Sequence, residues 1–381
     1  MSLGPLAGVR VVELAGIGPA PFACMLLAEL GADVIKVDRP SSGFLGLPAE
    51  SDLLNRGRPS VCIDLKSPAG VHTVRRLADT ADVLIEGFRP GVAERLGLGP
   101  DVLLEQRPSL VYGRMTGWGQ DGPWSGCAGH DIDYLALTGV LHAIGPAAAP
   151  VVPLNLVGDF GGGAMYLVVG VLAALLEARA TGDGQVVDAA IVDGATHLMT
   201  QAYGLMGAGV WTDKRESNLL DGGTPFYGVF ETSDDRHVAV GPLEPQFYAE
   251  FERLLGLSEP LPERTDIEEW QALRQRIADA IASRTRDEWT QVFEGSDACV
   301  APVLSMREAP LHPHLVARST FVEREGVAQP APAPRFSRTA TTLSTPPVSP
   351  GHDSREALLR WGIEDVDDLL TAGVVTQRSK A

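Results

Sequence analysis

Cysteine is scarce in this sequence. The 381 residues include only Cys24, Cys62, Cys127 and Cys299, and no two of them form a C-x-x-C pair. Widely spaced single cysteines are typical of reduced intracellular thiols and argue against a disulfide framework. We therefore expect a cytoplasmic protein that is held together by a hydrophobic core.

Basic residues are also in deficit. The chain carries 31 Lys and Arg against 49 Asp and Glu, a formal net charge of −18, which argues against general binding of nucleic acid. The deficit is uneven: residues 1–100 hold 10 basic and 11 acidic residues, whereas the remaining 281 hold 21 and 38. A nearly neutral N-terminal third is where an anionic ligand could bind, although chance clustering of charge would give the same pattern.

Long hydrophobic runs are missing as well. The longest uncharged apolar stretch, Phe160 to Leu176, has 17 residues and several glycines. It is shorter than the ~20 residues that span a bilayer, so we expect a buried core helix and no membrane contact. The N-terminal MSLGPLAGVR has no basic start followed by an apolar run, so no signal peptide is expected.

Three common site motifs are absent or incomplete. There is no G-x-x-x-x-G-K-[ST] phosphate loop and no G-x-S-x-G nucleophile elbow. The loop Gly16–Pro21, with Asp38 twenty residues after Gly18, nearly matches a dinucleotide fingerprint, but Pro21 takes the position of the third glycine. That glycine permits close packing of helix on strand, so a nicotinamide site is not favoured. His312 and His314 flank a proline without nearby ligand partners, so no metal site is expected.

Apolar runs and helical periodicity alternate in the first two hundred residues. The expected strands are Val9–Leu14, Val34–Val37, Val61–Asp64, Val83–Glu86 and Leu110–Met115, with helices at Phe22–Leu30 and Pro68–Asp79 between them. This alternation predicts an α/β fold with a Rossmann-like parallel sheet. We expect a large α/β domain of residues 1–200 and 330–381. A smaller α+β domain of residues 225–325 contains a hairpin, and residues 200–225 and 325–350 form linkers.

Two sequence features suggest acid/base chemistry. A helix starting at Asp131 would direct its first backbone N–H groups toward the surroundings of His130. A proton acceptor beside such donors is what forming an enolate from a thioester requires, although a histidine before a helix is often structural. Asp159 precedes three glycines, and an N-cap role would explain the aspartate alone. Bare glycines also permit close approach of a ligand or another backbone.

The ordered motifs resemble those of the class III coenzyme A-transferase (CaiB/BaiF-type) superfamily and, within it, the α-methylacyl-coenzyme A racemases. The resemblance covers essentially the whole chain. It is carried by GVRVVELAGIGPAP, GADVIKVDRP, Leu65-Lys66, EGFRPGVAERLGLGP, RMTGWGQDGP, AGHDIDYLALTGVLHAIG, PLNLVGDFGGGAM, GQVVDAAIVDG and LEPQFY. Each motif is modest alone, but together and in this order they are specific.

The resemblance implies a racemase or epimerase that interconverts (R)- and (S)-2-methylacyl-coenzyme A by two-base proton transfer through an enolate. The two bases would be His130 and Asp159, on opposite faces of the α-carbon. Glu244 would pair with His130, and the backbone N–H of Asp131 would bind the enolate oxygen. A neighbouring carboxylate raises the pKa of a histidine and fixes its tautomer.

The resemblance also implies how coenzyme A is held. Its phosphates would bind Arg39, Lys66, Arg89 and Arg95, although each cation alone is equally typical of a solvated surface. Arginine suits phosphate through its planar fork. Coenzyme A is part of the substrate, so no separate cofactor is expected. Members of the superfamily resemble interlocked rings, so we expect a homodimer in which Glu244 acts in its own chain or from the partner.

A coenzyme A transferase of the same superfamily is the main alternative. In that reaction Asp159 would act as a nucleophile and form a mixed anhydride, then an aspartyl thioester. A non-catalytic coenzyme A-binding protein is a third possibility. His130 and Glu244 together favour the racemase. The acyl group, whether branched fatty acyl, sterol side chain or arylpropionyl, cannot be read from the sequence.

Overall fold

The computed structural model describes residues 4–14, 16–39, 48–341 and 343–378. The chain divides into two compact units. Unit 1 combines Met1–Thr138, Pro153–Met199 and Ala331–Ala381, and unit 2 combines Gly139–Val152 with Thr200–Pro330. Residues 139–152, which the sequence placed with the large domain, therefore group with the smaller unit.

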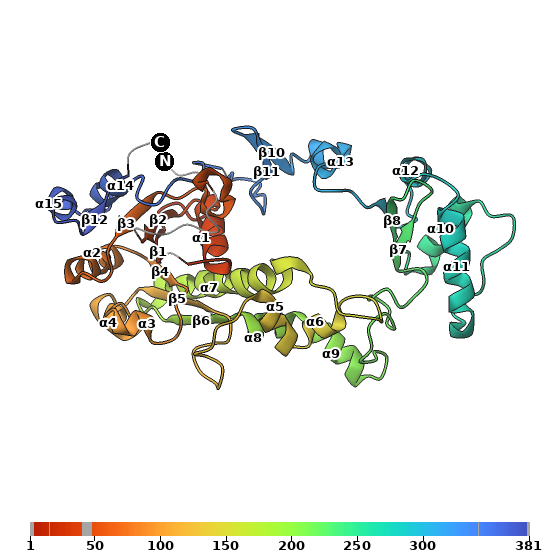
Figure 1. Ribbon diagram of the computed structural model, residues 1–381, viewed down its shortest axis with the longest axis horizontal. Helices are drawn as coiled ribbons and strands as arrows, with labels where there is room; N and C mark the ends of the chain where they lie inside the picture. Colours follow the sequence, from red (N-terminus) through yellow and green to blue (C-terminus); the bar gives the residue numbers. More distant parts are fainter. Residues whose placement is uncertain (1–3, 15, 40–47, 342, 379–381) are drawn as a thin grey trace. The chain divides into compact units, whose positions relative to one another are not determined.

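Unit 1 is built on a seven-stranded sheet (Figure 1). In spatial order its strands are β12 (Val375–Thr376), β3 (Ser60–Ile63), β2 (Asp33–Asp38), β1 (Arg10–Leu14), β4 (Val83–Glu86), β5 (Val111–Thr116) and β6 (Val186–Ala190). All neighbouring strands pair in parallel except β12, which runs antiparallel to β3. The predicted α/β fold with a parallel sheet is confirmed.

Helices cover both faces of this sheet, because successive residues of a strand point to opposite sides. Val11 joins a core cluster with residues of α1 and α7, whereas Val12 joins a second cluster with residues of α2 and α14. The α-helices of unit 1 are α1 (Pro19–Glu29), α2 (Pro68–Asp79), α3 (Val92–Arg95), α4 (Pro100–Gln106), α5 (Asp131–Leu137), α7 (Met165–Thr181), α8 (Ile191–Leu198), α14 (Ser354–Arg360) and α15 (Val366–Thr371). Short 3₁₀ turns are η1 (Ala49–Ser51), η2 (Leu53–Asn55) and η3 (Leu154–Leu156).

The segment around Asp159 differs from the prediction. Asp159 does not cap an α-helix; it is the third residue of a π-helix, η4 (Val157–Ala164), which continues directly into α7. A Cβ at Gly162 would lie 2.6 Å from the backbone nitrogen of Ala195, and one at Gly194 would lie 1.8 Å from the carbonyl oxygen of Gly162. The glycines are therefore required mainly by the close approach of η4 to α8.

One helical run, Leu154–Thr181, is long and apolar enough to cross a membrane by length and composition. Of its most apolar 18-residue window, 44% is buried. Leu167 and Val171 pack in the core, whereas Val169 and Leu176 are exposed. The expected buried core helix is thus buried along one face only.

Two arginines that follow η2, Arg56 and Arg58, connect their segment to the core of unit 1. The guanidinium of Arg58 pairs with Glu13 at 3.1 Å, and both side chains are fully buried. Arg58 also donates to the carbonyl of Pro21 at 2.6 Å, and Arg56 pairs with Glu29 at 2.7 Å. These cations fix the segment to β1 and α1, so their role is structural.

Unit 2 contains the predicted hairpin. Strands β7 (Gly228–Glu231) and β8 (His237–Val240) are antiparallel, and β9 (Val300–Pro302), which was not predicted, pairs with β8. The remaining elements are α6 (Val140–Ala143), α9 (Thr200–Gly207), α10 (Pro245–Leu255), η5 (Ile267–Glu269), α11 (Trp270–Ile281), α12 (Arg286–Phe293), η6 (Ala309–Leu311), α13 (Pro313–Ala317), β10 (Phe321–Arg324) and β11 (Val327–Pro330). A core that includes Phe251, Leu273 and Trp289 joins the small sheet to α10, α11 and α12.

Candidate active site

The predicted cations Arg39, Lys66 and Arg89 lie one to three residues beyond the carboxyl ends of β2, β3 and β4. The strand order places β1 beside β4, where the chain changes direction across the sheet. Ligands of open α/β sheets bind at such a switch point, outside the carboxyl ends of the strands. A Cβ at Gly16, after β1, would lie 4.0 Å from the Cα of Gly87, after β4, so the two loops are in contact here.

His130 lies at the start of α5, as predicted, and its side chain is exposed. Its backbone N–H donates to the carboxylate of Asp133 at 2.9 Å. The hydroxyl of Tyr134 donates to the carbonyl of Gly129, immediately before His130. Tyr134 packs so closely that a Cβ at Gly117 would lie 1.9 Å from its ring. The first turn of α5 therefore fixes the peptide that carries the imidazole.

Asp159 is half-buried, with one face against the loop after β1. A Cβ at Gly18, where φ is +72°, would lie 3.0 Å from its Oδ2. Asn155 donates to the same oxygen at 3.4 Å. Burial raises the pKa of Asp159 to about 6, because removing a carboxylate from water disfavours its charged form. The negative charge of Asp131 adds to the increase, and Asn155 and His130 oppose it.

His130 and Asp159 belong to one electrostatic cluster, since the charge of His130 acts on the pKa of Asp159. Neither group is sealed from solvent: the imidazole is exposed and the carboxylate is half-buried. We call His130, Asp131 and Asp159 the acid/base cluster. A carboxyl group with a pKa of about 6, within electrostatic reach of an imidazole, can take and return protons close to neutral pH.

Asp131 is the first residue of α5, so its backbone N–H has no partner within the helix. The N–H is therefore not used by the helix, and its role in binding the enolate oxygen stays a prediction. The side chain does something that the sequence did not indicate. Its Oδ1 accepts the backbone N–H of Asp159 at 2.7 Å, and the N–H of Gly158 also bonds to this carboxylate.

The four predicted phosphate-binding cations, which we call the cation set, are all exposed. Arg39 follows β2 and its guanidinium lies 5.8 Å from the ring centroid of Phe88. Arg89 follows β4 and is near enough to Tyr134 for its charge to act on the pKa of that phenol. Arg95 is the last residue of α3, and Lys66 follows β3, farther along the sheet from the β1–β4 switch point.

A charge network that was not predicted from the sequence lies at the start of the loop that carries Arg89. The carboxylate of Glu86 accepts the backbone N–H of Phe88 at 2.6 Å and the Nε of Arg114 at 3.1 Å. Arg114 also pairs with Glu94 of α3. The sequence did contain a sign of this network, because Glu86 in β4 and Arg114 in β5 are charged residues in strands that are mostly apolar. The network connects both strands to the loop and so fixes its start.

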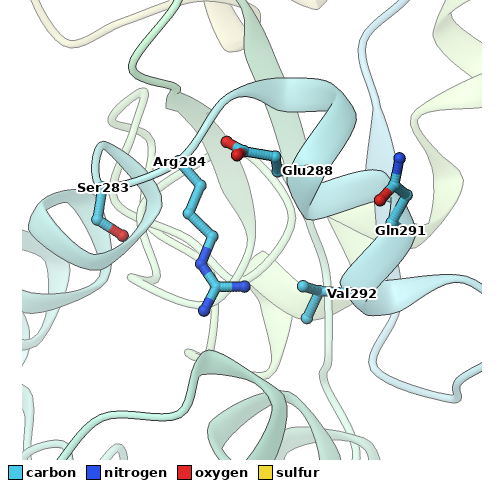
Figure 2. A pocket seen from close by; sticks show the side chains of 5 residues that line it. All are labelled: Ser283, Arg284, Glu288, Gln291 and Val292. Atoms are coloured by element: carbon cyan, nitrogen blue, oxygen red, sulfur yellow. The ribbon is translucent and has the colours of Figure 1, made fainter.

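Glu244 lies in unit 2, where it precedes the first turn of α10 and is exposed. Its pairing with His130 of unit 1 stays a prediction. A surface hollow in unit 2 is lined by Ser283, Arg284, Glu288, Gln291 and Val292, and their side chains are shown in Figure 2. None of the predicted site residues lines it, and nothing about it indicates chemistry. In the described part of the chain, no three His, Cys, Asp or Glu residues are grouped so that they could hold a metal ion.

Comparison with known proteins identifies the family. Residues 6–354 match the sequence pattern of CoA-transferase family III, so the chain belongs to this family. It is 44% identical to the alpha-methylacyl-CoA racemase of Mus musculus, over 96% of this chain and 95% of the relative. It is 43% identical to the human protein of the same name, over 90% and 88%. The succinyl-CoA:glutarate CoA-transferase of Mus musculus is 30% identical, over 99% and 91%.

Solved structures share the fold of this chain. The crystal structure of Rv3272 from Mycobacterium tuberculosis matches with a TM-score of 0.76 and 28% identity, covering 93% of this chain and 99% of that one. A CAIB/BAIF family protein from Brucella suis matches in fold with a TM-score of 0.80 at 24% identity, covering 94% and 100%.

Proposed function

We propose that this protein is an α-methylacyl-coenzyme A racemase. The observation that carries the proposal is its 44% identity, over nearly the whole of both chains, to a relative that bears this name. The acid/base cluster supports it, because two proton-transfer groups are present where a transferase that uses one aspartate as nucleophile needs only one. We propose a cytoplasmic location on the spacing of the cysteines.

The proposed reaction removes one proton from the α-carbon and delivers another to its opposite face. One base removes the proton from the α-carbon, and the electron pair of the C–H bond forms the double bond of an enolate whose negative charge lies on the thioester oxygen. The backbone N–H of Asp131 donates to this oxygen. The other group, protonated beforehand, returns a proton to the opposite face. His130 and Asp159 exchange these roles between the two enantiomers. A pKa of about 6 lets Asp159 serve in both roles near neutral pH.

We propose that the cation set binds the phosphates of coenzyme A. Arg39 follows β2 and Arg89 follows β4, the strands on either side of β1. Both residues are therefore near the switch point where α/β sheets hold ligands. Glu244 is proposed to pair with His130 and to fix its tautomer. We also propose a homodimer. Exposed apolar side chains on α7, namely Met165, Val169 and Leu176, are of the kind that a subunit interface covers.

A transferase is the second candidate, because relatives named as CoA-transferases are also similar to this chain over nearly its full length. Asp159 would then attack the thioester carbonyl. The two reactions differ in whether the α-proton is exchanged.

A test incubates one enantiomer of a 2-methylacyl-coenzyme A in D₂O without a free acid. A racemase incorporates deuterium at the α-carbon and inverts the configuration. A transferase does neither, but accumulates an enzyme-bound thioester that hydroxylamine cleaves. The absence of both products would contradict the proposal and indicate a protein that only binds coenzyme A.

A further inference from the structure

The first turn of α5 and the start of η4 meet through one side chain. The Asp131 carboxylate accepts the N–H of Asp159 at 2.7 Å and also bonds the N–H of Gly158. These are the second and third residues of η4, where backbone N–H groups have no partner within the helix. Asp131 therefore caps η4 from a different helix, 28 residues away in the sequence.

This contact requires Gly158. A Cβ at position 158 would lie 2.2 Å from Oδ1 of Asp131 and 2.9 Å from its Cγ. These separations are far below van der Waals contact, so any larger residue at position 158 displaces the carboxylate. The glycine and the aspartate thus form one structural element, which is independent of the glycines that pack against α8.

The π-helix explains why such a cap is needed. A π-helical segment is rarely stable by itself and commonly occurs at functional sites, where neighbouring groups hold it. A negative charge at the start of a helix is favourable, because the helix dipole is positive there. Asp131 supplies both the hydrogen-bond acceptor and the charge. The backbone of Asp159 is thereby held to the residue that follows His130.

We infer that the side chain of Asp131 is a positioning residue for the reaction proposed above: it caps η4 and so holds Asp159 opposite His130. This role is separate from the proposed role of its backbone N–H, which a side-chain substitution leaves in place. Asp133, two residues later in the same turn, bonds the N–H of His130 instead. Asp133 is therefore a matched control for Asp131, because its carboxylate fixes the peptide of His130 and not that of Asp159.

The test resolves proton exchange at the two faces of the α-carbon. Each enantiomer is incubated in D₂O with the wild-type enzyme and with the Asp131→Ala and Asp133→Ala variants. Inversion needs both bases, whereas exchange with retention needs only the base that faces the proton. We expect Asp131→Ala to lower inversion by about 100-fold, as misplacing a reacting group does. For the enantiomer whose α-proton faces His130, exchange with retention should fall by less than about fivefold, because the position of His130 does not depend on Asp131.

Asp133→Ala should weaken exchange at the His130 face instead. Asp131→Asn keeps one acceptor oxygen for the N–H of Asp159, so it should recover part of the inversion rate. Equal losses at both faces in Asp131→Ala, or no loss of inversion, would overturn the inference, since a general structural defect affects both bases alike.

Gly158→Ala supplies an independent variant. It should reproduce the exchange pattern of Asp131→Ala, because the new methyl group displaces the carboxylate. In the Asp131→Ala background the same substitution should add little, so the two effects should not be additive. Additive effects would show that Gly158 and Asp131 act separately and would contradict the inference.

Amide hydrogen exchange tests the cap without depending on the reaction. Peptides that cover residues 157–164 should exchange about tenfold faster in Asp131→Ala than in the wild type, and Asp133→Ala should not change them. If the wild-type enzyme neither inverts nor exchanges its substrate, the proposed function fails, while this measurement still decides whether Asp131 caps η4. Unchanged protection of residues 157–164 would overturn it.

Discussion

The acid/base cluster and the cation set lie at the same edge of one sheet but are constructed differently. In the cluster, backbone groups on both sides of the reacting side chains are fixed: the His130 peptide by Asp133 and Tyr134, and the Asp159 peptide by Asp131. The cation set consists of exposed side chains on loops and on the short helix α3. The backbone of the acid/base cluster is thus held by hydrogen bonds, whereas the cation set consists of side chains at the surface.

The difference matches the two tasks that we propose. Proton transfer needs reacting atoms held within a fraction of an ångström, and this favours short contacts within rigid elements. Phosphate groups are large and highly charged, so long side chains can reach them from several positions. Substitutions in the cluster should therefore lower the rate of reaction, whereas substitutions in the cation set should weaken binding.

The largest effect should come from removing a base. His130→Ala and Asp159→Ala should each lower racemisation by about 10³-fold, the range that a general acid or base contributes. Binding of coenzyme A should stay within about twofold, because neither side chain belongs to the cation set. Steady-state rates and calorimetric affinities measure the two quantities. An equal loss of binding and rate would mean that the residue is structural. The acid/base cluster and the cation set would then not differ in the way proposed.

The pH dependence of the rate should report the raised pKa of Asp159. Below that pKa, about 6, the carboxyl group of Asp159 is protonated and can no longer take the proton from the α-carbon. Racemisation should therefore fall by about tenfold per pH unit below pH 6, equally in both directions. The phosphate of coenzyme A also titrates in this range, so the thioester of dephospho-coenzyme A provides the control. An acid limb that begins below pH 4.5 would contradict the assignment.

Removing a cation should change binding more than rate. Arg89→Ala should raise KM by about fivefold, the loss expected of one charge-assisted contact, with kcat within about twofold. The effect should shrink at high salt, because exposed charges are screened. Arg76 is a suitable control: it lies on α2 and pairs with Asp365 at 2.7 Å, outside both groups. Equal effects of Arg76→Ala would show that overall charge, and not the proposed site, determines affinity.

The smallest effect concerns stability. The folded pKa of Asp159, about 6, is above the ordinary value of 3.8, so folding disfavours its charged form. The stabilising contribution of protonated Asp159 is therefore lost progressively as pH rises from about 4 to about 6. Asp159→Asn removes this loss and should stabilise the protein at pH 7.5 by about 1 kcal/mol, a value reduced for partial exposure. Urea unfolding at pH 7.5 and pH 4 measures it. A gain that persists at pH 4 would have another cause.

Much of the fold could be predicted because its signals are local. Val83–Glu86 was predicted as a strand and Pro68–Asp79 as a helix, with the same bounds that the structure shows. Apolar strand runs, proline at the first helical position and glycine after the last turn act within a few residues. His130 before a helix was predictable for the same reason, since α5 begins at Asp131.

The environment of Asp159 could not be predicted in this way. The π-helix at residues 157–164 contacts two segments that are distant in the sequence: Asp131 accepts a hydrogen bond from its backbone, and α8 approaches it closely. The raised pKa of Asp159 depends on burial, which no spacing in the sequence reveals. The pairing of Arg114 with Glu86 and Glu94 likewise connects residues on three separate elements.

The sequence by itself determined which residue types are available: an imidazole before a helix, an aspartate before three glycines, and cations after strand ends. Its periodicity also determined the α/β alternation, because backbone preferences and burial patterns are properties of short segments. Only the tertiary structure decided that the Asp131 side chain bonds to the backbone of Asp159 and that Asp159 is half-buried. Hydrogen bonds and desolvation act over a few ångströms in space, between residues that the chain itself keeps far apart.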